Sequence, residues 1–438
     1  MTMTYPEQVK DILMSEIRLM AQSPWMFAVN PDADFTRRRK LDLEALLRFL
    51  VTKESDTTAC ELLKFLDFDA DTVSNSAFFQ QRKKLHPNAL PFLLRRFNSN
   101  FPFVLYRGLY NLVACDGCDF NIFRNPDDPD TFHTTNGASE RGFNSVLAVA
   151  LYDLLSKRYL DCIVQPGRKK NEFGAFCELI DRYAYDGVPI FIGDRGFASY
   201  NVYAHAIENG RLFVVRAKDI NVRRLLLLKD LPDALDTRAD IILSRTKAKK
   251  YLKHLDSFDR YRFITPTVAF DFIERGSSDD YQMSLRIVRF ETADGVFLNV
   301  VTNLPSDEFC TEDIKHLYTL RWSIETSFRD LKHNIGASDF ISKKPIYIEQ
   351  EIWARLILFN FCSVITAHVV VTHMNTKHLY QVNFTMAMKI CHDFVRRRES
   401  EPAPDVERLI GRYTLPIRLG RNYERRHRFQ TPFNFCYR

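Results

Sequence analysis

Three acidic residues that lie far apart in the sequence could together bind divalent metal ions. Asp116 follows the apolar residues 112–115, Asp194 follows the apolar residues 189–193, and Glu325 lies in a segment with helical periodicity. A carboxylate just beyond a buried strand is held on rigid backbone and still reaches a cleft, so it suits a metal ligand. Magnesium prefers oxygen ligands and usually keeps several waters, so two or three protein carboxylates suffice. The sequence therefore predicts a site for Mg²⁺ or Mn²⁺ that holds two ions.

Each aspartate has a simpler interpretation when it is considered alone. Asp116 precedes a glycine and Asp194 precedes an Arg-Gly pair, and both patterns are common in turns. Two strand-end aspartates from one sheet weaken that interpretation, because neighbouring strands bring their ends together. With Glu325 added, two metal ions could activate a water or a 3′-hydroxyl for in-line attack on phosphorus. The three carboxylates thus favour metal-dependent phosphoryl transfer.

Glu325 is the acidic residue whose spacing carries the most information. A helix is expected from Thr311 to about residue 334. At about 100° per residue, Glu325 shares one side of this helix, within about 60°, with Tyr318, Arg321 and Lys332. An adjacent apolar stripe would pack on the sheet and consists of Leu317, Leu320, Ile324, Phe328 and Leu331. The alternative is a solvated face whose Arg321–Glu325 pair contributes only a few tenths of a kcal/mol.

The basic and aromatic residues near the carboxylates suit contacts with phosphate groups. Arg321 and Lys332 would contact the phosphates beside a scissile bond, and an arginine can bind two oxygens at once. Tyr318 could donate a hydrogen bond to a phosphate or stack on a base. Arg195, which follows Asp194, could support a phosphate contact or pair with a neighbouring side chain.

The elements that would position these residues indicate an α/β fold. Residues 1–100 show helical periodicity, with Thr57 or Thr58 and Ser74 or Ser76 as expected helix caps. Apolar runs alternate with helices from residue 102 to 217, which indicates an α/β sheet core. Residues 218–308 contain runs typical of successive antiparallel strands and predict a β-rich insertion. The expected strands are residues 103–106, 110–115, 144–151, 159–165, 189–193 and 212–216, then 241–243, 261–264, 267–273, 283–290 and 296–301 in the insertion.

The composition is that of a globular protein with a basic C-terminal tail. Hydrophobic residues make up 46% of the chain and charged residues 26%, which argues against widespread disorder. The formal net charge is +6. Residues 396–438 alone carry this charge, with eleven Arg, no Lys and five acidic residues. Positive charge concentrated in this way suits a polyanionic partner.

Cysteine spacing and the absence of apolar targeting segments predict a cytoplasmic location. The nine cysteines are irregularly spaced and include one CxxC pair without a second, so we expect reduced thiols. The first residues lack the features of a signal peptide. The most apolar stretch, residues 356–371, contains polar residues and is shorter than the ~18 to 20 residues of a membrane span, so we expect a buried helix and no membrane partner.

The residues around Glu325 resemble the signature of the insertion sequence four family of bacterial transposases. The pattern is Tyr318-x2-Arg321-x3-Glu325-x6-Lys332, within the stretch LYTLRWSIETSFRDLK. The Asp-Gly pair, the Asp-Arg-Gly-Phe element and a Val-Thr-Asn-Leu run before the signature helix are also similar. The resemblance covers about residues 105–375, and the order Asp, Asp, Glu agrees with it. This family belongs to the larger DDE group of transposases.

The resemblance implies a ribonuclease H-like core, which is a mixed α/β sheet flanked by helices. It also implies that the β-rich insertion lies between the second Asp and the Glu. The helical periodicity of residues 1–100 predicts an all-helical N-terminal domain before the core. The expected domains are residues 1–100 for binding DNA ends, 101–217 and 309–375 for the two parts of the catalytic core, 218–308 for the insertion, and 376–438 for a helical, Arg-rich tail.

The resemblance further implies cut-and-paste transposition at the terminal inverted repeats of an insertion sequence. Water cleaves one strand, the freed 3′-hydroxyl attacks the opposite strand to give a hairpin, and after reopening the 3′ ends join target DNA. The implied partners are double-stranded DNA and a second copy of the chain, in the bacterial nucleoid. Two other interpretations stay open: a catalytically inactive DNA-binding protein on the same fold, and a nuclease that cuts but cannot join.

Contacts with DNA outside the core are further hypotheses. Trp322 and Trp353 could act as wedges between bases, or belong to the core. The expected helix at residues 76–85 could be part of a helix-turn-helix reader or a solvated charged face. Its candidate contacts are Gln81, Arg82 and Lys83. In the tail, Arg425 and Arg426 and the neighbouring arginines fit neutralisation of the phosphate backbone.

Overall fold

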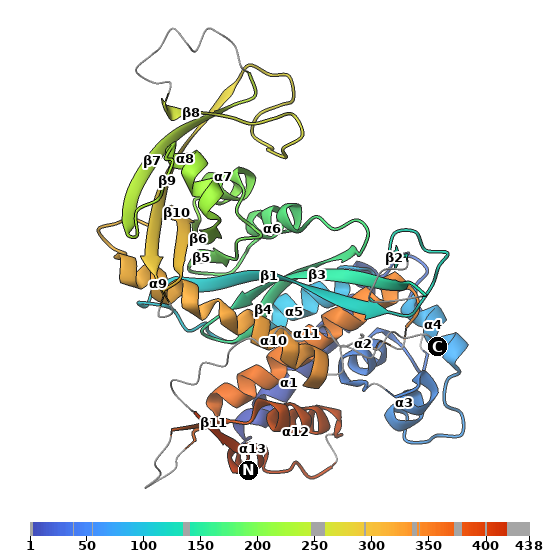
Figure 1. Cartoon of the computed structure of the whole chain (residues 1–438). Coiled ribbons are helices and arrows are strands. Elements are labelled where there is room, and N and C mark those ends of the chain that lie inside the picture. The colour runs from blue at the N-terminus through green and yellow to red at the C-terminus, as the bar shows by residue number, and fades with distance from the viewer. Residues whose placement is uncertain are drawn as a thin grey trace.

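A large mixed β-sheet runs through the molecule and carries helices on both faces (Figure 1). The computed structural model describes residues 3–37, 39–54, 56–134, 141–246, 259–292, 295–334, 340, 342–371, 379–398 and 401–417. The strand order in the sheet is β2-β3-β1-β5-β6-β10-β9-β7-β8, and β4 pairs with β3. Helices and strands are thus combined in one mixed α/β fold, as the sequence predicted.

The centre of the sheet consists of strands that the sequence predicted. These are β1 (Tyr110–Ile122), β3 (Phe143–Asp153), β4 (Arg158–Pro166), β5 (Val188–Gly193) and β6 (Leu212–Ala217). β3 is antiparallel to both β1 and β4, whereas β5 is parallel to β1 and β6 is parallel to β5. Helix α6 (Glu172–Asp181) connects β4 to β5, and α7 (Tyr200–Glu208) connects β5 to β6. The expected strand at residues 103–106 is reduced to an isolated bridge at Tyr106.

The strands of residues 218–308 extend the same sheet. They are β7 (Leu235–Ser244), β8 (Tyr261–Phe263), β9 (Asp280–Glu291) and β10 (Phe297–Thr302), and β10 joins them to β6. β7, β9 and β10 pair antiparallel as expected, but β8 pairs parallel to β7. Residues 267–273 form no strand, and α8 (Asp219–Leu226), which was not predicted from the sequence, begins the segment. β2 (Phe132–His133) pairs with β3 at the far edge.

One face of the sheet is covered by helices from both ends of the chain. The long α11 (Pro345–His368) contacts β4 and packs most extensively against four helices that share one hydrophobic core with it. Because that core is continuous, the N-terminal helices are packed into the same layer as the C-terminal ones. The four are α1 (Tyr5–Gln22), α2 (Leu43–Thr52), α5 (Ala89–Ser99) and α12 (Phe384–Arg396).

A second core fills the opposite face, beneath α6, α7 and α8. The remaining elements are η1 (Pro24–Phe27), α3 (Thr58–Phe65), α4 (Asn75–Arg82), α13 (Val406–Arg412), and the small sheet of β11 (Tyr380–Val382) and β12 (Thr414–Pro416). The predicted caps are confirmed, because the side chain of Thr57 accepts a hydrogen bond at the start of α3 and that of Ser74 does so at the start of α4.

The helix that carries Glu325 is divided into two. α9 (Thr311–Leu320) and α10 (Trp322–Asn334) meet at Arg321, where the sequence predicted one continuous helix. The N–H of Arg321 donates to the carbonyl of Tyr318, three residues back, so the helix tightens at this point. The predicted apolar stripe is buried: Leu317, Ile324, Phe328 and Leu331 lie in the core, and Leu320 packs against it.

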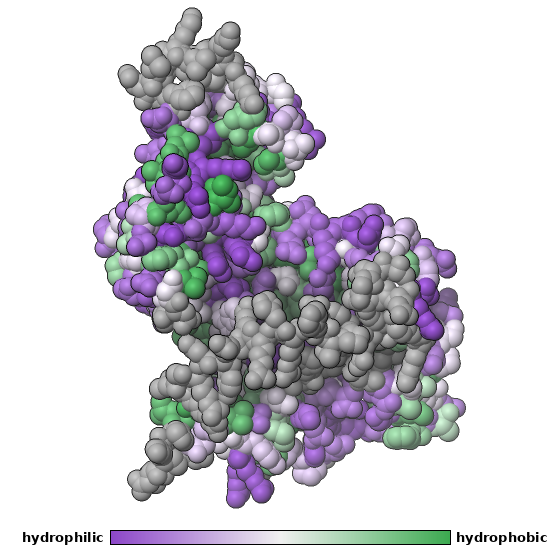
Figure 2. Space-filling view, viewed as in Figure 1, coloured by the Kyte–Doolittle hydropathy of each residue, from purple (hydrophilic) through white to green (hydrophobic). Residues whose placement is uncertain are grey.

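Hydrophilic residues cover most of the described surface on the face shown in Figure 2, and hydrophobic residues lie there in small separate areas. The apolar α11 is buried along most of its length, as the sequence predicted. Among the described residues, no helix combines the length and apolar character that a membrane span requires.

Candidate active site

Asp116 lies inside β1, so the prediction that it follows the end of a strand is wrong. β1 stays paired with β3 through Ile122, and Asp116 is opposite Ala150. The missed signal is the alternation of apolar residues after Asp116, because Cys118, Phe120 and Ile122 are all buried. What ends beside Asp116 is the pairing of β1 with β5, whose last register pair is Cys115 with Gly193.

Asp194 follows the last residue of β5, as predicted. Asp116 and Asp194 are therefore each the first residue after the final β1–β5 pair. The Oδ1 atom of Asp194 accepts a hydrogen bond from the N–H of Gly196 at 2.7 Å. A Cβ at Gly196 would lie only 2.8 Å from that oxygen, so a side chain there would displace the Asp194 carboxylate. Phe197 is buried in the core beneath α6 and α7 and anchors the turn.

The alternation of β1 directs Asp116 toward the helices that carry Glu325. Cys115 belongs to the core beneath α6 and α7, whereas Ala114 and Cys118 belong to the core of the helical layer. Because side chains alternate along a strand, Asp116 shares the face of Ala114 and Cys118. α10 packs against β1 on this side, and Glu325 lies in its first turn.

Burial and neighbouring charges together determine the pKa of Asp116. Burial raises the pKa of Asp116 from 3.8 to about 6, and the negative charges of Asp194 and Glu325 contribute to this rise. The N–H of Gly117 and the charge of Arg321 act in the opposite direction. The N–H of Gly117 and the charge of Arg321 therefore compensate only part of the negative charge of Asp116 and its neighbours.

Arg321 is the buried cation of this region. Its side chain is 7% exposed, and one of its terminal nitrogens donates to Oε1 of Glu325 at 2.8 Å. The guanidinium carbon lies 5.7 Å from the ring centroids of both Tyr318 and Trp322. Among the described residues, no acceptor lies within hydrogen-bonding distance of its Nε atom. The i, i+4 pair that the sequence offered as an alternative therefore exists, but it is not on a solvated face.

The other candidate DNA-contacting residues near the carboxylates differ in exposure. Tyr318 is buried, with 9% of its surface exposed, whereas Trp322 is 49% exposed. Lys332 lies along β1, 5.1 Å from the ring centroid of Phe120, and lowers the pKa of Cys118, which burial otherwise raises. Arg195 is exposed.

The two tryptophans also differ from each other. Trp353 is buried in α11, which agrees with the core role that the sequence allowed for it. Trp322 is half-exposed, so a plain core role is wrong for that residue.

The donor atoms present are those that Mg²⁺ or Mn²⁺ prefers, but they are not preassembled. All three candidates are carboxylates, which are hard oxygen ligands. Within the described part of the chain, no group of three or more His, Cys, Asp or Glu side chains is arranged to hold a metal ion. One physical reason is visible at Glu325, whose Oε1 atom is engaged by Arg321.

A fourth carboxylate near the strand ends was not predicted from the sequence. Glu172 is the first residue of α6, and a Cβ at Gly117 would lie 3.5 Å from its Cδ atom. Burial raises the pKa of Glu172, and the charges of Asp119 and Asp194 contribute. The sequence signal that could have identified Glu172 is its place just after β4. β4 runs in the same direction as β1, so the residues that follow it begin near the end of the sheet where Asp194 lies.

Two of the predicted DNA contacts on α4 are wrong in this structure. Arg82 is 1% exposed, and its guanidinium donates to Gln350 at 2.7 Å and to Glu351 at 3.2 Å. Gln81 is also buried, with 8% exposed, so neither side chain is presented to a partner. Lys83 is exposed and stays a candidate. Arg425 and Arg426 lie outside the described residues.

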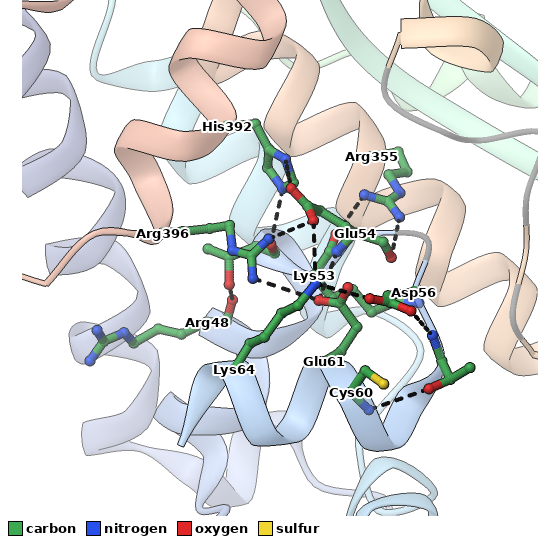
Figure 3. Close-up of polar contacts among 12 residues, drawn as sticks. Arg48, Lys53, Glu54, Asp56, Cys60, Glu61, Lys64, Arg355, His392 and Arg396 are labelled. Atoms are coloured by element: carbon green, nitrogen blue, oxygen red, sulfur yellow. Dashed lines mark hydrogen bonds and ion pairs between the residues drawn. The ribbon is translucent and has the colours of Figure 1, made fainter. Parts of the chain in front are cut away.

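Arg82 belongs to what we call the Glu351 cluster, formed by Glu351, Lys53, Arg82 and Arg355. Figure 3 shows its margin, where α2, α3 and α12 meet. Arg355 donates to the backbone carbonyls of Lys53 and Glu54 at 2.7 and 3.1 Å. A cleft of about 720 Å³ lies beside this margin, and its lining includes none of the three candidate carboxylates.

All three carboxylates lie within the segment that matches a known protein family. A model of the transposase DDE domain family matches residues 108–361, which is more than half of the sequence. Transposase InsL for insertion sequence element IS186A of Escherichia coli strain K12 is 24% identical over 192 residues, which cover 41% of this chain and 52% of that protein. The transposase for insertion sequence element IS421 of Escherichia coli matches with the same identity and coverage.

The chain spans about half the length of the curated relatives it matches. A solved structure, a cryo-EM synaptic complex of piggyBac transposase with hairpin DNA, has a TM-score of 0.44 and 10% identity. That similarity covers 96% of this chain and 87% of the other.

Proposed function

This chain belongs to the family of transposase DDE domains, and we propose that it is a DNA transposase that cleaves and joins phosphodiester bonds. The finer proposal is cut-and-paste transposition of an insertion sequence at its terminal inverted repeats. The partners would be double-stranded DNA and a second copy of the chain in the synaptic complex, in the bacterial nucleoid. The observation that carries the proposal is the position of Asp116 and Asp194 after the final β1–β5 pair, with α10 and Glu325 packed on the same side.

We also propose that the core is ribonuclease H-like. Three successive antiparallel strands, β1, β3 and β4, are followed by β5 and β6, which run in the direction of β1 and are reached through helices. In this arrangement β5 and the pairing between β1 and β5 end at one edge of the sheet, where α10 can add a third carboxylate. We propose domain boundaries at residues 100, 217, 308 and 375, which separate the segment for binding DNA ends, the two parts of the catalytic core, the β-rich insertion and the C-terminal tail.

The proposed ligands of the divalent metal ions are Asp116, Asp194 and Glu325. The partial excess of negative charge at Asp116 supports this assignment, because a divalent cation would relieve it. A bound pair of Mg²⁺ or Mn²⁺ ions supplies activation of the attacking water or 3′-hydroxyl and stabilisation of the leaving oxygen. Arg321 and Lys332 would bind the flanking phosphates, and the half-exposed Trp322 would contact a base.

An excision assay tests this function directly. A plasmid that carries the element's ends is combined with the wild type or with Asp116→Ala, Asp194→Ala or Glu325→Ala. Each substitution should abolish excision while the far-ultraviolet circular dichroism spectrum stays that of a folded protein. Unchanged excision in any one variant would show that the assigned site is wrong.

The same assay separates the two other functions. A catalytically inactive DNA-binding protein would give no excision with the wild type, although it would still bind the ends. A nuclease that cuts but cannot join would excise, yet would give no product when precut ends are incubated with target DNA and magnesium. Joined product from precut ends supports the transposase.

A further inference from the structure

Arg321 is hydrogen-bonded to one of the three proposed metal ligands. Its guanidinium donates to a carboxylate oxygen of Glu325 at 2.8 Å. That hydrogen bond uses the Oε1 atom of Glu325, which is an oxygen that a metal ion would need. A divalent cation and Arg321 would thus compete for the same oxygen atom of Glu325.

The contacts of Arg321 hold its side chain in place but leave one of its hydrogen-bond donors without an acceptor among the described residues. Its side chain is almost fully buried, and its guanidinium lies near the rings of Tyr318 and Trp322, whose faces attract a cation. Among the described residues its Nε nevertheless finds no acceptor, and a buried donor without a partner costs free energy. A phosphate would offer this guanidinium two oxygens in a bidentate geometry.

The backbone position of Arg321 favours movement toward such a phosphate. The residue lies at the turn between α9 and α10, and the next residue, Trp322, is 49% exposed. The guanidinium of Arg321 thus lies near a residue that is half exposed to solvent.

We propose that Arg321 is a built-in competitor for the metal, which occupies Glu325 until a DNA phosphate draws the guanidinium away. This inference rests on the proposed function, because it assumes that Asp116 and Glu325 are metal ligands. It makes Arg321 a positioning residue that binds either Glu325 or a DNA phosphate, but not both at once. The free protein then binds metal weakly, and DNA and metal bind cooperatively. By thermodynamic linkage, each strengthens the other by the same factor.

Binding of Mn²⁺, followed by electron paramagnetic resonance of the free ion, tests this inference without reference to catalysis. The full chain is titrated alone and with a short blunt-ended duplex of mixed sequence at low ionic strength, and fluorescence anisotropy confirms duplex binding in the same samples. In the wild type, DNA should tighten Mn²⁺ binding by about tenfold, within the usual range of coupling between two ligands. In Arg321→Met, Mn²⁺ should bind about tenfold more tightly without DNA, and DNA should add little.

Matched variants separate failure of this inference from failure of the proposed function. Arg329→Met removes an exposed cation from α10, the helix that carries Glu325, and should leave Mn²⁺ binding as in the wild type. Arg321→Lys keeps the positive charge but loses the planar guanidinium that can bind two oxygens. It should tighten Mn²⁺ binding in the absence of DNA as Arg321→Met does, but by a smaller factor. This variant replaces Arg321→Met in the test if the Met variant does not fold.

If Asp116→Asn and Glu325→Gln bind Mn²⁺ as well as the wild type, the proposed metal site itself is wrong. If those variants lose Mn²⁺ but Arg321→Met binds no more tightly than the wild type, the site stands and the competition by Arg321 is overturned. The competition is also overturned if bound duplex leaves the affinity of the wild type for Mn²⁺ unchanged.

Discussion

The Glu351 cluster and the proposed active site are both groups of charged side chains, but their balance of charge is opposite. In the Glu351 cluster, one buried carboxylate faces the cations of Lys53, Arg82 and Arg355. Burial would raise the pKa of Glu351, but these charges outweigh it and lower that pKa to about 2. In the proposed active site, the buried guanidinium of Arg321 acts on Asp116 and Glu325, and burial nevertheless raises the pKa of Asp116 to about 6.

The difference distinguishes a structural cluster from a binding site. Glu351 is 2% exposed and joins α11 to the end of α2 and to α4, so its charge is compensated within the protein. Asp116, Asp194 and Glu325 are half-buried around the point where the β1–β5 pairing ends, where compensation is incomplete and a cation from solution can supply it. Substitutions in the first cluster should therefore cost stability, and those in the second should cost activity.

The largest expected effect is on catalysis. Asp194→Asn keeps an oxygen that can accept from the N–H of Gly196 but removes the charge that metal requires. Cleavage of DNA ends should slow by about three orders of magnitude or more, whereas the free energy of unfolding should change by less than about 1 kcal/mol. Both are measurable, by single-turnover cleavage and by urea unfolding. A large loss of stability would show that Asp194 has a structural role, and the comparison would fail.

The next largest effect should be on stability. Glu351→Ala leaves Lys53 and Arg82 buried without their carboxylate, which typically costs about 3–5 kcal/mol. Urea unfolding measures this loss, and Glu44→Ala is the control, because the exposed Glu44–Arg48 pair at 3.7 Å should contribute only a few tenths of a kcal/mol. Equal losses in the two variants would contradict the structural role of the cluster.

A smaller, pH-dependent effect should distinguish Asp116. Because its pKa is raised from 3.8 to about 6 in the folded protein, wild-type stability should fall as the pH rises through that range. Asp116→Asn lacks this loss, so in metal-free buffer it should be more stable than the wild type at pH 8, by on the order of 1 kcal/mol for a half-buried group. The difference should vanish near pH 4. Thermal unfolding across pH checks this, and a variant less stable at pH 8 would refute it.

The smallest expected effect concerns binding of DNA. Lys332→Met should weaken duplex binding and reduce the slope of log affinity against log salt by about one, because one phosphate contact is lost. Lys53→Met removes a lysine of the Glu351 cluster, which is buried, and should leave that slope unchanged. Anisotropy titrations at several salt concentrations measure both. Equal slopes in all three proteins would remove Lys332 from the proposed interface.

Local patterns of the sequence were sufficient to predict most elements. Apolar alternation located the core strands, and Thr57 and Ser74 were recognised as caps, because these features depend on neighbours within a few residues. The spacing of Tyr318, Arg321, Glu325 and Lys332 was sufficient to indicate the family. Local patterns failed where distant partners decide the outcome: Asp116 lies within β1 because β3 stays paired beyond it, and Arg82 is buried because Glu351, far along the chain, offers it a carboxylate.

By itself, then, the sequence determined most of the secondary structure, the family and the three acidic candidates, since each follows from composition and short-range spacing. Only the tertiary structure decided that β10 attaches residues 218–308 to the core sheet, and that Arg321 is buried against Glu325. Pairing of strands and burial of charge depend on which surfaces meet, and no short stretch of sequence contains that information.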